Sequence, residues 1–518
     1  MDIIKIDPYL NVDPGTLNPR EHGEVFVTEE IWDFEPVKDS VFTISEIDQD
    51  FGTYERFLGH PIHPRNNITS GQIYLSVILK ERKGEFLGKT VQVIPHITDE
   101  IKKRIRLVSE TTKTDAVITE VGGTVGDIEA MPFLEAIRQF RLEEPPGDTA
   151  LVHVTFVPYL EKVGQLKSKP SQHSVKALQG MGLQPDVMVG RARTDLTDDI
   201  RQKISLFCNV PQEAVISSLY IDVVYDMPLI FEEQGLGKYL CRILNLEKQK
   251  PDLDKWKSIS ELFKNRRRVV NIAMPGKYCE IVDSYVSINE ALLHAGAHAG
   301  AEVEIKWIET EEFEENPSKL SALQGFDGIL LTPGFGFRGV EGMTKCAEYA
   351  IKHKIPYLGI CFGAQLLFVT FCRSMLGLEG ANSTEVDSDT KFPVVDLLPE
   401  QRQVDSKGGT MRLGAQEILI KKGTKLFEAY GKERVVERFR HRYHIMNEYA
   451  KQAEQKGLIA SAYDPTGRII NAIELSGDSW IVGVQFHPEF RSRPDAPSPI
   501  YHAFVKEALK YSRARQQL

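Results

Sequence analysis

The chain has 518 residues and a formal net charge of −10, with 42% hydrophobic and 26% charged residues. This length is enough for two or three domains, and the composition is that of an ordinary globular protein. The net negative charge argues against a general nucleic-acid-binding surface, and the absence of any run of 18 apolar residues argues against a membrane span. We therefore expect neither nucleic acid nor a membrane among its partners.

Cysteine usage and the first residues bear on the cellular compartment. The six cysteines are scattered without C-x-x-C pairs, which argues against a disulfide framework and a zinc site and is typical of a reducing environment. The first residues show no signal-peptide pattern. Together these observations predict a cytoplasmic protein.

The first half of the chain alternates between apolar runs and charged, helical stretches. A short strand is predicted at residues 3–7, followed by a polar loop at 8–16 that is rich in turn-forming residues. Further apolar runs at 116–119, 151–157, 186–190 and 214–217 are separated by stretches with a helical pattern. This alternation predicts a parallel α/β sheet.

A second domain is predicted after a polar, charged segment. Residues 248–255 lack apolar periodicity, and three arginines at 266–268 precede a new apolar run at 269–274. We therefore expect a first domain at 1–245, a linker at 246–266 and a second domain at 267–518. Predicted strands at 303–307 and 328–331 indicate that the second domain is also α/β.

Cys361 stands where a nucleophile is expected. The apolar run 357–360 ends at this cysteine, Gly363 follows, and a helical pattern begins. This pattern predicts a tight strand-to-helix turn that exposes the sulfur and directs the following N–H groups toward one point, where an oxyanion can be stabilised.

A thiol has an ordinary pKa of about 8.5 and needs a nearby base to act as a nucleophile at neutral pH. Residues 482–486 are expected to form a strand that runs into His487 and Glu489. Residues two apart on an extended chain face the same side. We therefore expect Glu489 to orient His487, and His487 to take the proton of Cys361.

Two segments resemble the class I glutamine amidotransferases. Residues 359–365 read G-I-C-F-G-A-Q and residues 485–489 read Q-F-H-P-E, and both are similar to motifs of that family. The resemblance implies glutamine hydrolysis through a cysteinyl thioester, with release of ammonia. It also implies a set of glutamine-binding residues, namely Gly334, Phe362, Gln365, Glu385 and Arg442. A carboxylate for the α-amino group and an arginine for the α-carboxylate suit an amino-acid site.

A second resemblance covers nearly the whole chain. Residues 5–16 (K-I-D-P-Y-L-N-V-D-P-G-T) and 21–28 (E-H-G-E-V-F-V-T) resemble the CTP synthases, as do segments 51–57, 90–98, 119–129, 164–174 and 207–211. The resemblance implies a P-loop-type, parallel-sheet amidoligase domain followed by an α/β class I glutamine amidotransferase domain. The implied reaction aminates UTP to CTP, using ATP and ammonia cut from glutamine.

The same resemblance implies the nucleotide and metal sites. The implied nucleotide-binding residues are Lys5, Asp127, Ile128, Glu129, Lys167, Lys169, Gln172 and Lys203. Among them, Lys5 is expected near the ATP phosphates and residues 127–129 near CTP, the feedback inhibitor. Asp50 and Glu120 are expected to hold Mg²⁺, which prefers hard oxygen ligands. The resemblance further implies GTP as an activator and a homotetramer that can form filaments.

Three features depart from the family pattern. The family opens with a strand and a G-x-x-x-x-G-K loop for the ATP phosphates, whereas this sequence starts past that point, so we expect an N-terminally incomplete amidoligase domain. Residues 84–90 are a poor substitute, because they are one residue short between the glycines and precede an apolar run. Residues 29–47 look inserted where the family has a short acidic loop. Pro333 stands where the family has glycine and offers no N–H to an oxyanion, unless Gly334 is the donor.

These departures leave three hypotheses open. The chain is a CTP synthase, or a glutaminase-only or regulatory homologue that cannot use ATP, or a non-enzymatic subunit of filaments or scaffolds. Loss of glutamine hydrolysis on replacement of Cys361 separates the second hypothesis from the third, because only an enzyme depends on a nucleophile.

Overall fold

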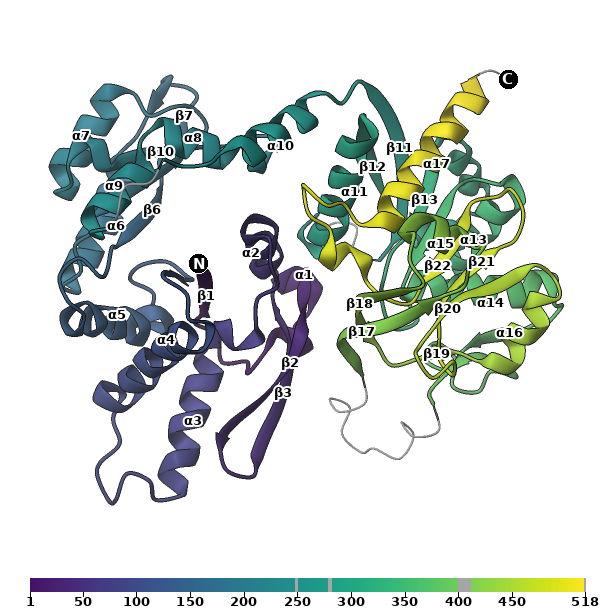
Figure 1. Cartoon of the computed structure of the whole chain (residues 1–518), viewed down its shortest axis with the longest axis horizontal. Helices are drawn as coiled ribbons and strands as arrows, with labels where there is room; N and C mark the ends of the chain where they lie inside the picture. The colour runs from purple at the N-terminus through teal and green to yellow at the C-terminus, as the bar shows by residue number, and fades with distance from the viewer. Residues whose placement is uncertain (247–249, 278–281, 399–410, 517–518) are drawn as a thin grey trace. The chain divides into compact units, whose positions relative to one another are not determined.

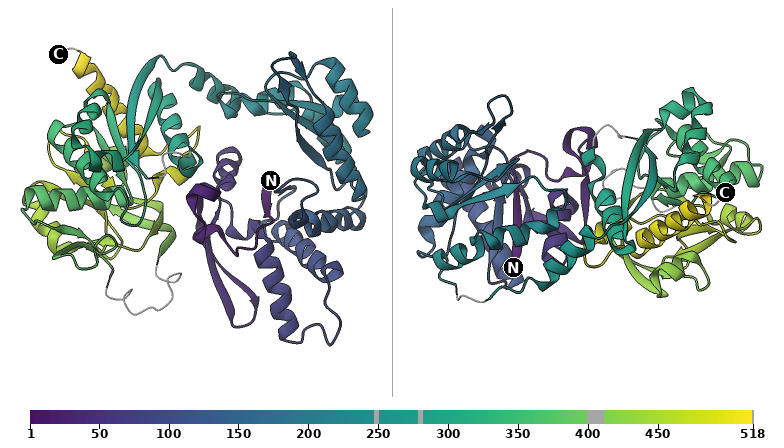
Figure 2. Two further views of the ribbon diagram at one scale, coloured as in Figure 1. Left: turned by 180° about the vertical axis from the view of Figure 1, so that it is seen from behind. Right: turned by 90° about the horizontal axis from the view of Figure 1, so that it is seen from above.

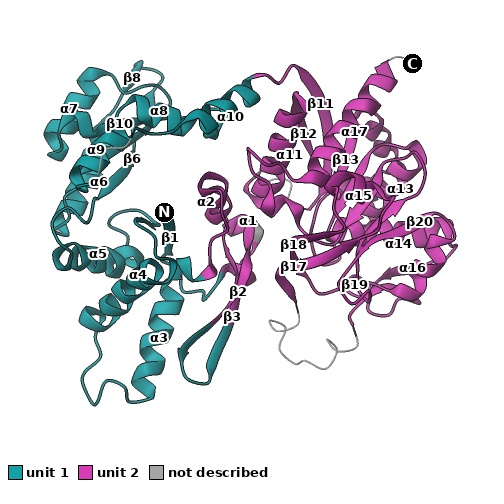
Figure 3. Ribbon diagram, viewed as in Figure 1, with its two compact units in different colours: residues 1–13, 34–42, 65–264 teal, residues 14–33, 43–64, 265–518 magenta. Residues whose placement is uncertain are grey.

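The computed structural model describes residues 1–246, 250–277, 282–398 and 411–516 (Figure 1). The chain separates into two compact units (Figure 3). Unit 1 comprises residues 1–13, 34–42 and 65–264, and unit 2 comprises residues 14–33, 43–64 and 265–518. Each unit contains parallel strands and helices, so the expected α/β class is confirmed for both.

Unit 1 holds two three-stranded parallel sheets. The first has the order β4-β1-β5, with β1 at Asp2–Asp7, β4 at Asn67–Thr69 and β5 at Val117–Val121. The second has the order β10-β9-β6, with β6 at Val152–Phe156, β9 at Val187–Ala192 and β10 at Val215–Leu219. All of these strands except β4 lie within two residues of a strand expected from the sequence. A short hairpin, β7 at Tyr159–Leu160 and β8 at Gln165–Leu166, precedes α6.

Helices lie between and after these strands in the sequence of unit 1. They are α3 (Ser70–Arg82), α4 (Thr98–Thr112), α5 (Met131–Glu143), α6 (Lys169–Gly180), α7 (Asp198–Cys208), α8 (Met227–Glu233), α9 (Leu236–Ile243) and α10 (Asp254–Lys264). Ile4 and Ile6 of β1 share a core with Ile73 of α3 and Ile101 of α4. Residues 83–88 form turns directly after α3, so this segment follows a helix and not a strand, unlike a phosphate-binding loop.

The segment that looks inserted in the sequence forms a regular hairpin. Strands β2 (Val25–Val37) and β3 (Ser40–Asp48) pair into a two-stranded sheet, with Asp39 at a φ of 68° in the turn. Phe34 is buried, and the guanidinium of Arg104 lies 4.6 Å from its ring centre. The short helices α1 (Pro19–His22) and α2 (Asp50–Leu58) flank the hairpin. Residues 29–47 therefore form regular secondary structure.

Unit 2 is built on a nine-stranded sheet of order β12-β11-β13-β14-β22-β21-β20-β17-β18. Figure 2 shows the ribbon of the chain from two further directions. The parallel strands are β11 (Arg268–Gly276), β12 (Ala301–Glu309), β13 (Gly328–Leu331), β14 (Tyr357–Ile360) and β22 (Ile481–Val484). The antiparallel extension comprises β21 (Ile470–Leu475), β20 (Leu458–Tyr463), β17 (Arg412–Ile420) and β18 (Arg434–His441). A smaller sheet contains β15 (Ala381–Ser383), β16 (Phe392–Asp396) and β19 (His444–Ile445).

Helices cover both faces of the large sheet because successive side chains of a strand point to opposite faces. Leu330 and Leu358 join a core with α11 (Val286–Ala299) and α17 (Pro499–Gln516), whereas Leu331 and Tyr357 join a core with α13 (Val340–His353) and α14 (Phe362–Met375). The remaining helices are α12 (Glu311–Glu315), α15 (Lys425–Tyr430) and α16 (Asn447–Glu454). The carboxyl end of β14 therefore lies between the layer of α11 and α17 and the layer of α13 and α14.

Candidate active site

Cys361 lies in the turn between β14 and α14. Its φ of 52° and ψ of −101° are uncommon for a residue other than glycine and mark a strained backbone. The N–H of Cys361 donates to the carbonyl of Val484 at 2.7 Å, and its own carbonyl accepts from Ala364 and Gln365, where the helix begins. The expected strand-to-helix turn is present, and it places the sulfur at the first turn of α14.

Two glycines allow this turn to form. A Cβ atom on Gly359 would lie 2.7 Å from the carbonyl of Gly363, and a Cβ atom on Gly363 would overlap the carbonyl oxygen of Leu331. Both atoms in the way belong to the backbone, which cannot rotate aside as a side chain does. The close approach of α14 to β13 and β14 therefore depends on the absence of side chains at both positions.

The sulfur of Cys361 is surrounded by polar groups. Its thiol donates to the carbonyl of Arg440 at 3.7 Å, and the side-chain amide of Gln485 donates to the sulfur at 3.5 Å. The amide of Gln365 donates to the Gln485 side chain at 3.1 Å and to the carbonyl of Tyr443 at 3.0 Å. Gln365 thus orients Gln485. The contact between Gln485 and the sulfur was not predicted, although Gln485 is the first residue of the Q-F-H-P-E motif.

His487 and Glu489 form a buried pair. The Nδ1 atom of His487 lies 2.7 Å from Oε1 of Glu489. The expected contact is correct, but the extended strand expected to carry both residues is wrong. Strand β22 ends at Val484, and Pro488–Arg491 is a 3₁₀ turn. Pro488 fixes the start of that turn, because its φ is preset for a helical first position, and the turn brings the carboxylate back to the imidazole.

Glu489 and the sulfur of Cys361 both act on the pKa of His487. Burial alone would lower the pKa of His487, but the charges of Glu489 and Cys361 outweigh it and raise that pKa to about 10. The Nε2 atom of His487 is buried and makes no hydrogen bond of ordinary geometry within the described residues, although the Cys361 sulfur is close enough to raise the pKa of the ring. The imidazole therefore has one nitrogen fixed by Glu489 and one nitrogen available for proton exchange with a reacting group.

A loop at residues 333–337 lies beside the turn. Lys277 donates from Nζ to the carbonyls of Phe335 at 2.9 Å and Gly336 at 2.6 Å. The N–H of Gly336 donates to Glu385 at 3.1 Å. A Cβ atom on Gly334 would lie 3.8 Å from the ring of Phe362, the residue after the cysteine. The loop is therefore held from both sides next to Cys361.

Glu385, Arg442 and Lys277 form a charged cluster in this region. Burial raises the pKa of Glu385, although the Gly336 N–H and the charges of Lys277 and Arg442 oppose that change. Burial lowers the pKa of Lys277 to about 8. Lys277 was not among the predicted site residues, and its only local signal is its place directly after the β11 strand.

Lys277→Met is expected to lower kcat for glutamine hydrolysis about tenfold without lowering the melting temperature. The change removes both tethers of the loop, while a side chain of similar length fills the space without the cost of a buried ammonium group. Steady-state glutamate release and thermal unfolding measure the two effects. Lys345→Met, which removes another lysine-to-carbonyl bond in unit 2, serves as the control. An unchanged kcat would show that the loop needs no tether.

Another buried acid lies close to the His487–Glu489 pair. Glu437 accepts a hydrogen bond from the Tyr430 hydroxyl at 2.7 Å. Burial raises the pKa of Glu437 from 4.5 to about 7, and the charge of Glu489 acts in the same direction. Because the folded protein then binds a proton more tightly than the unfolded chain, the stability from this group falls as the pH rises from about 4.5 to about 7.

Glu437→Gln is therefore expected to stabilise the protein more at pH 8 than at pH 5, by a difference of about 3 kcal/mol. Glutamine keeps an acceptor for Tyr430 and removes the buried charge. Thermal unfolding at the two pH values measures the difference. Glu417→Gln, at a more exposed carboxylate of the same sheet, provides the control. Equal shifts at both pH values would contradict the prediction.

In unit 1, several predicted nucleotide and metal residues lie at the carboxyl ends of β1 and β5. Lys5 is buried and pairs with Glu120 at 3.0 Å between neighbouring positions of the two strands. A Cβ atom on Gly122 would lie 2.8 Å from the carbonyl oxygen of Ile6, so only glycine allows this approach. Asp7 follows β1 residue Ile6 and was not among the predicted site residues. Its carboxylate accepts a hydrogen bond from the side-chain amide of Asn67 at 2.7 Å.

The other predicted residues of unit 1 lie in two other regions, one after β5 and one around α6 and α7. Residues 127–129 follow β5, where the N–H of Thr124 donates to Asp127 at 3.2 Å. Near the start of α6, Lys167 bonds to Gln165 and Gln172 bonds to Ser168. The ammonium of Lys169 lies 5.5 Å from the ring of Phe207 on α7, and Lys203 on α7 pairs with Asp199 at 2.6 Å.

The predicted magnesium ligands fall in different units. Asp50 begins α2 in unit 2, and Glu120 lies near the end of β5 in unit 1. Over the described ranges, no group of three or more His, Cys, Asp or Glu side chains has the arrangement of a metal site. No helix in that part of the chain is both long and apolar enough to cross a membrane.

A cysteine turn at the carboxyl end of a parallel sheet, with a buried His–Glu pair nearby, is the arrangement expected of an enzyme with a cysteine nucleophile. Residues 280–507 match the family model for class-I glutamine amidotransferases, and residues 1–246 match the model for the CTP synthase N-terminus. The chain thus combines a glutamine amidotransferase with a synthase region.

Two relatives match this chain over nearly its whole length, and one solved structure matches part of it. The CTP synthase of Pyrococcus abyssi is 50% identical over 513 residues, covering 99% of this chain and 92% of the relative. A CTP synthase of Thermus thermophilus is also 50% identical, over 98% of this chain and 91% of the relative. The solved glutaminase domain of Trypanosoma brucei CTPS with bound acivicin is 34% identical over 46% of this chain and 94% of that domain, with a TM-score of 0.45. The chain belongs to the CTP synthase family, glutamine-hydrolysing ligases that aminate UTP to CTP. The two other hypotheses are not favoured.

Proposed function

We propose that Cys361 is the nucleophile of glutamine hydrolysis, that His487 transfers the proton and that Glu489 orients His487. The carrying observation is the buried His487–Glu489 pair at 2.7 Å, with the Cys361 sulfur among the groups that raise the pKa of His487. The sulfur attacks the side-chain carbonyl of glutamine, and His487 gives its proton to the leaving ammonia. Water then cleaves the thioester, with His487 accepting the proton of water, and releases glutamate.

The same region suits the rest of the glutamine molecule. Glu385 is proposed to take the α-ammonium group, and Arg442 the α-carboxylate, with Gln365 as a further contact to the substrate. Gly334 is proposed to supply an N–H to the oxyanion, together with Phe362 at the start of α14. The position of Gly334 beside the Phe362 ring supports it as donor in place of Pro333.

The synthase region is proposed to bind ATP, Mg²⁺ and UTP. Members of this family use ATP and Mg²⁺, and the metal neutralises charge on the transferring phosphate. Asp50 and Glu120 are the proposed metal ligands, and Lys5 the proposed contact to the ATP phosphates. The triphosphate of UTP is assigned to the remaining lysines and glutamine, namely Lys167, Lys169, Gln172 and Lys203. Residues 127–129 are assigned to CTP as a feedback inhibitor.

Further properties of the family are proposed for this chain. They are activation by GTP, a homotetramer that can form filaments, and a division at residues 1–245, 246–266 and 267–518. Residues 1–518 contain no G-x-x-x-x-G-K sequence. ATP-dependent CTP formation from UTP and ammonium chloride by residues 1–518 shows directly whether the nucleotide site works without such a loop.

An electrophilic analogue of glutamine tests the proposed nucleophile. We expect one adduct per chain, on Cys361, and protection by excess glutamine. Burial raises the pKa values of Cys208 to about 11 and of Cys372 to about 12, so these thiols stay protonated and unreactive at neutral pH. Peptide mass spectrometry locates the adduct. A glutamine-protected adduct on another cysteine would contradict the assignment.

A further inference from the structure

Arg438 of β18 carries a fully buried guanidinium group near the candidate active site. Its Nη2 atom lies 2.6 Å from Oε2 of Glu55, and its Nη1 atom donates to the carbonyl of Val27 at 2.8 Å. The guanidinium carbon lies 5.1 Å from the ring centre of Phe26. A buried charge is costly without well-placed partners, so this set holds Arg438 in one position.

The backbone of Arg438 in turn holds His487. The N–H of His487 donates to the carbonyl of Arg438 at 2.8 Å. The imidazole stacks on Phe490 at 5.3 Å and 18°, and Phe490 meets the edge of Phe26 at 5.2 Å and 73°. The backbone of His487 is therefore held by Arg438, and its ring is supported by Phe26 through Phe490.

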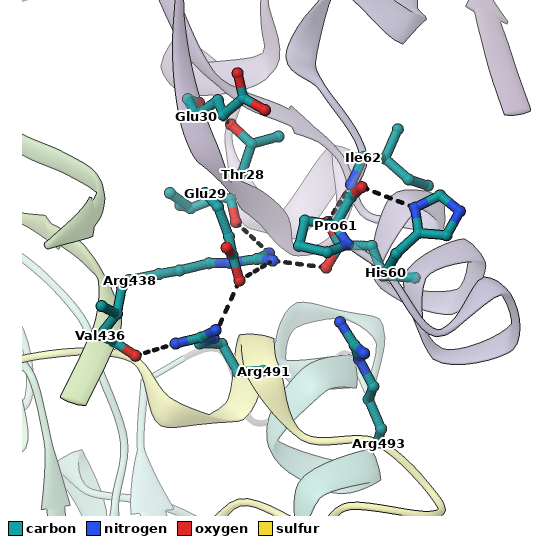
Figure 4. A network of polar contacts seen from close by, with 12 residues as sticks. Thr28, Glu29, Glu30, His60, Pro61, Ile62, Val436, Arg438, Arg491 and Arg493 are labelled. Atoms are coloured by element: carbon teal, nitrogen blue, oxygen red, sulfur yellow. Dashed lines mark hydrogen bonds and ion pairs between the residues drawn. The ribbon is translucent and has the colours of Figure 1, made fainter. Parts of the chain in front are cut away.

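The turn that carries Glu489 has a second attachment to the same N-terminal segment. Figure 4 shows Arg491 between Glu29 and the carbonyl of Val436; its Nε atom lies 3.1 Å from Oε1 of Glu29. The Nη2 atom of Arg438 also lies 3.4 Å from Oε1 of Glu29. One carboxylate thus joins the turn at Pro488–Arg491 to strand β18.

These contacts join distant parts of the sequence inside unit 2. Residues 26–29 and Glu55 lie within the range that matches the CTP synthase N-terminus, whereas Arg438 and His487 lie in the amidotransferase range. The segments 14–33 and 43–64 therefore complete the packing around His487. The division proposed at residue 267 follows the order of the sequence, and these two segments pack in unit 2 although they precede that division.

We propose that the Glu55–Arg438 ion pair positions His487 for glutamine hydrolysis, so that two short N-terminal segments form part of the glutaminase site. Among the described residues, the hydrogen bonds of the sulfur are to Arg440 and Gln485, and the role of Glu55 and Arg438 is to fix the strand and turn that carry the base. This inference rests on the proposed roles of Cys361 and His487. A misplaced base lowers the rate of the chemical step rather than the binding of glutamine.

Glu55→Gln in the full chain is the first test. The variant keeps the shape of the side chain and removes its charge. We expect kcat for glutamine hydrolysis to fall about 30-fold, with KM within about threefold of wild type, because geometry rather than binding is disturbed. CTP formation from UTP, ATP, Mg²⁺ and ammonium chloride is expected to stay unchanged. Arg438→Lys is expected to retain more glutaminase activity than Arg438→Met, since it keeps a cation beside Glu55.

A matched control and a second variant make the test decisive. Glu417→Gln removes the partner of Arg434 in an exposed pair between β17 and β18, and is expected to leave kcat unchanged. If Glu55→Gln does not fold, Phe26→Leu removes the aromatic support of Phe490 and is expected to lower kcat about tenfold. A wild-type kcat, a rise in KM alone, or an equal loss of ammonia-dependent CTP formation would overturn the proposal.

Cys361→Ala separates this inference from the proposed function. If that variant still hydrolyses glutamine, the assignment of the nucleophile fails, and the positioning role of Arg438 fails with it. If it is inactive while Glu55→Gln hydrolyses glutamine at the wild-type rate, only the positioning role fails.

Discussion

Cys361→Ala is expected to lose glutamine-dependent CTP formation, by about 10⁴-fold or more, while CTP formation from ammonia continues at the wild-type rate. Covalent catalysis has no substitute in this site, since the groups around the sulfur are amides, carbonyls and an imidazole. Glutamine hydrolysis and UTP amination are separate reactions that share ammonia, so removal of the nucleophile stops only the first.

The measurement follows CTP and glutamate in parallel, once with glutamine and once with ammonium chloride as the nitrogen source. Cys372→Ala, a buried cysteine farther along α14, is the control and is expected to leave both reactions intact. Continued glutamate release by Cys361→Ala would remove Cys361 from its assigned role. Loss of the ammonia-dependent reaction as well would show that the change disturbs more than the nucleophile.

Local sequence patterns were sufficient to place the turn at Cys361. An apolar run, a cysteine and a glycine two residues later are all neighbours in the chain, and strand-to-helix turns are determined by such neighbours. The same holds for the parallel strands of both units, whose apolar runs end close to the observed strand ends. The contact between His487 and Glu489 was predicted correctly, but a 3₁₀ turn rather than a strand produces it.

Contacts between distant residues could not be read from the sequence. Glu55 and Arg438 are 383 positions apart, and neither has a local pattern that marks it as buried. Lys277 has an ordinary charged side chain whose two carbonyl partners lie 58 and 59 residues away. Periodicity reports which face of an element is apolar, whereas a buried charge is explained only by the partner that the fold brings to it.

The segment at residues 29–47 illustrates the same limit. Its sequence shows no match to the short acidic loop of the family, and so it looked inserted. Its alternating apolar residues nevertheless build a hairpin, in which Phe34 is buried and lies 6.1 Å from Phe42. The hairpin forms by pairing of two strands that are close in sequence, and its signal in the sequence is the alternation of apolar residues with a period of two.

Gly363→Ala is expected to destabilise unit 2 and to lower glutamine hydrolysis about 10²-fold. Alanine is the better helix former by about 1 kcal/mol, so propensity alone predicts a gain. The new Cβ atom would overlap the carbonyl oxygen of Leu331 and lie 3.0 Å from its carbonyl carbon. Relief of this overlap must move α14 away from β13, at a cost of about 1–3 kcal/mol, and it moves the Cys361 turn with the helix.

Thermal unfolding and kcat for glutamate release measure the two effects of Gly363→Ala. Gly325→Ala is the matched control, because a Cβ atom there meets no atom within 4 Å, and it is expected to change neither quantity. The two measurements belong together, since the same displacement of α14 strains the core and misplaces the sulfur. A destabilised variant with wild-type kcat would mean that the turn at Cys361 keeps its geometry independently of α14. A variant with wild-type stability and wild-type kcat would contradict the prediction, because it would mean that α14 accommodates the added Cβ atom without moving.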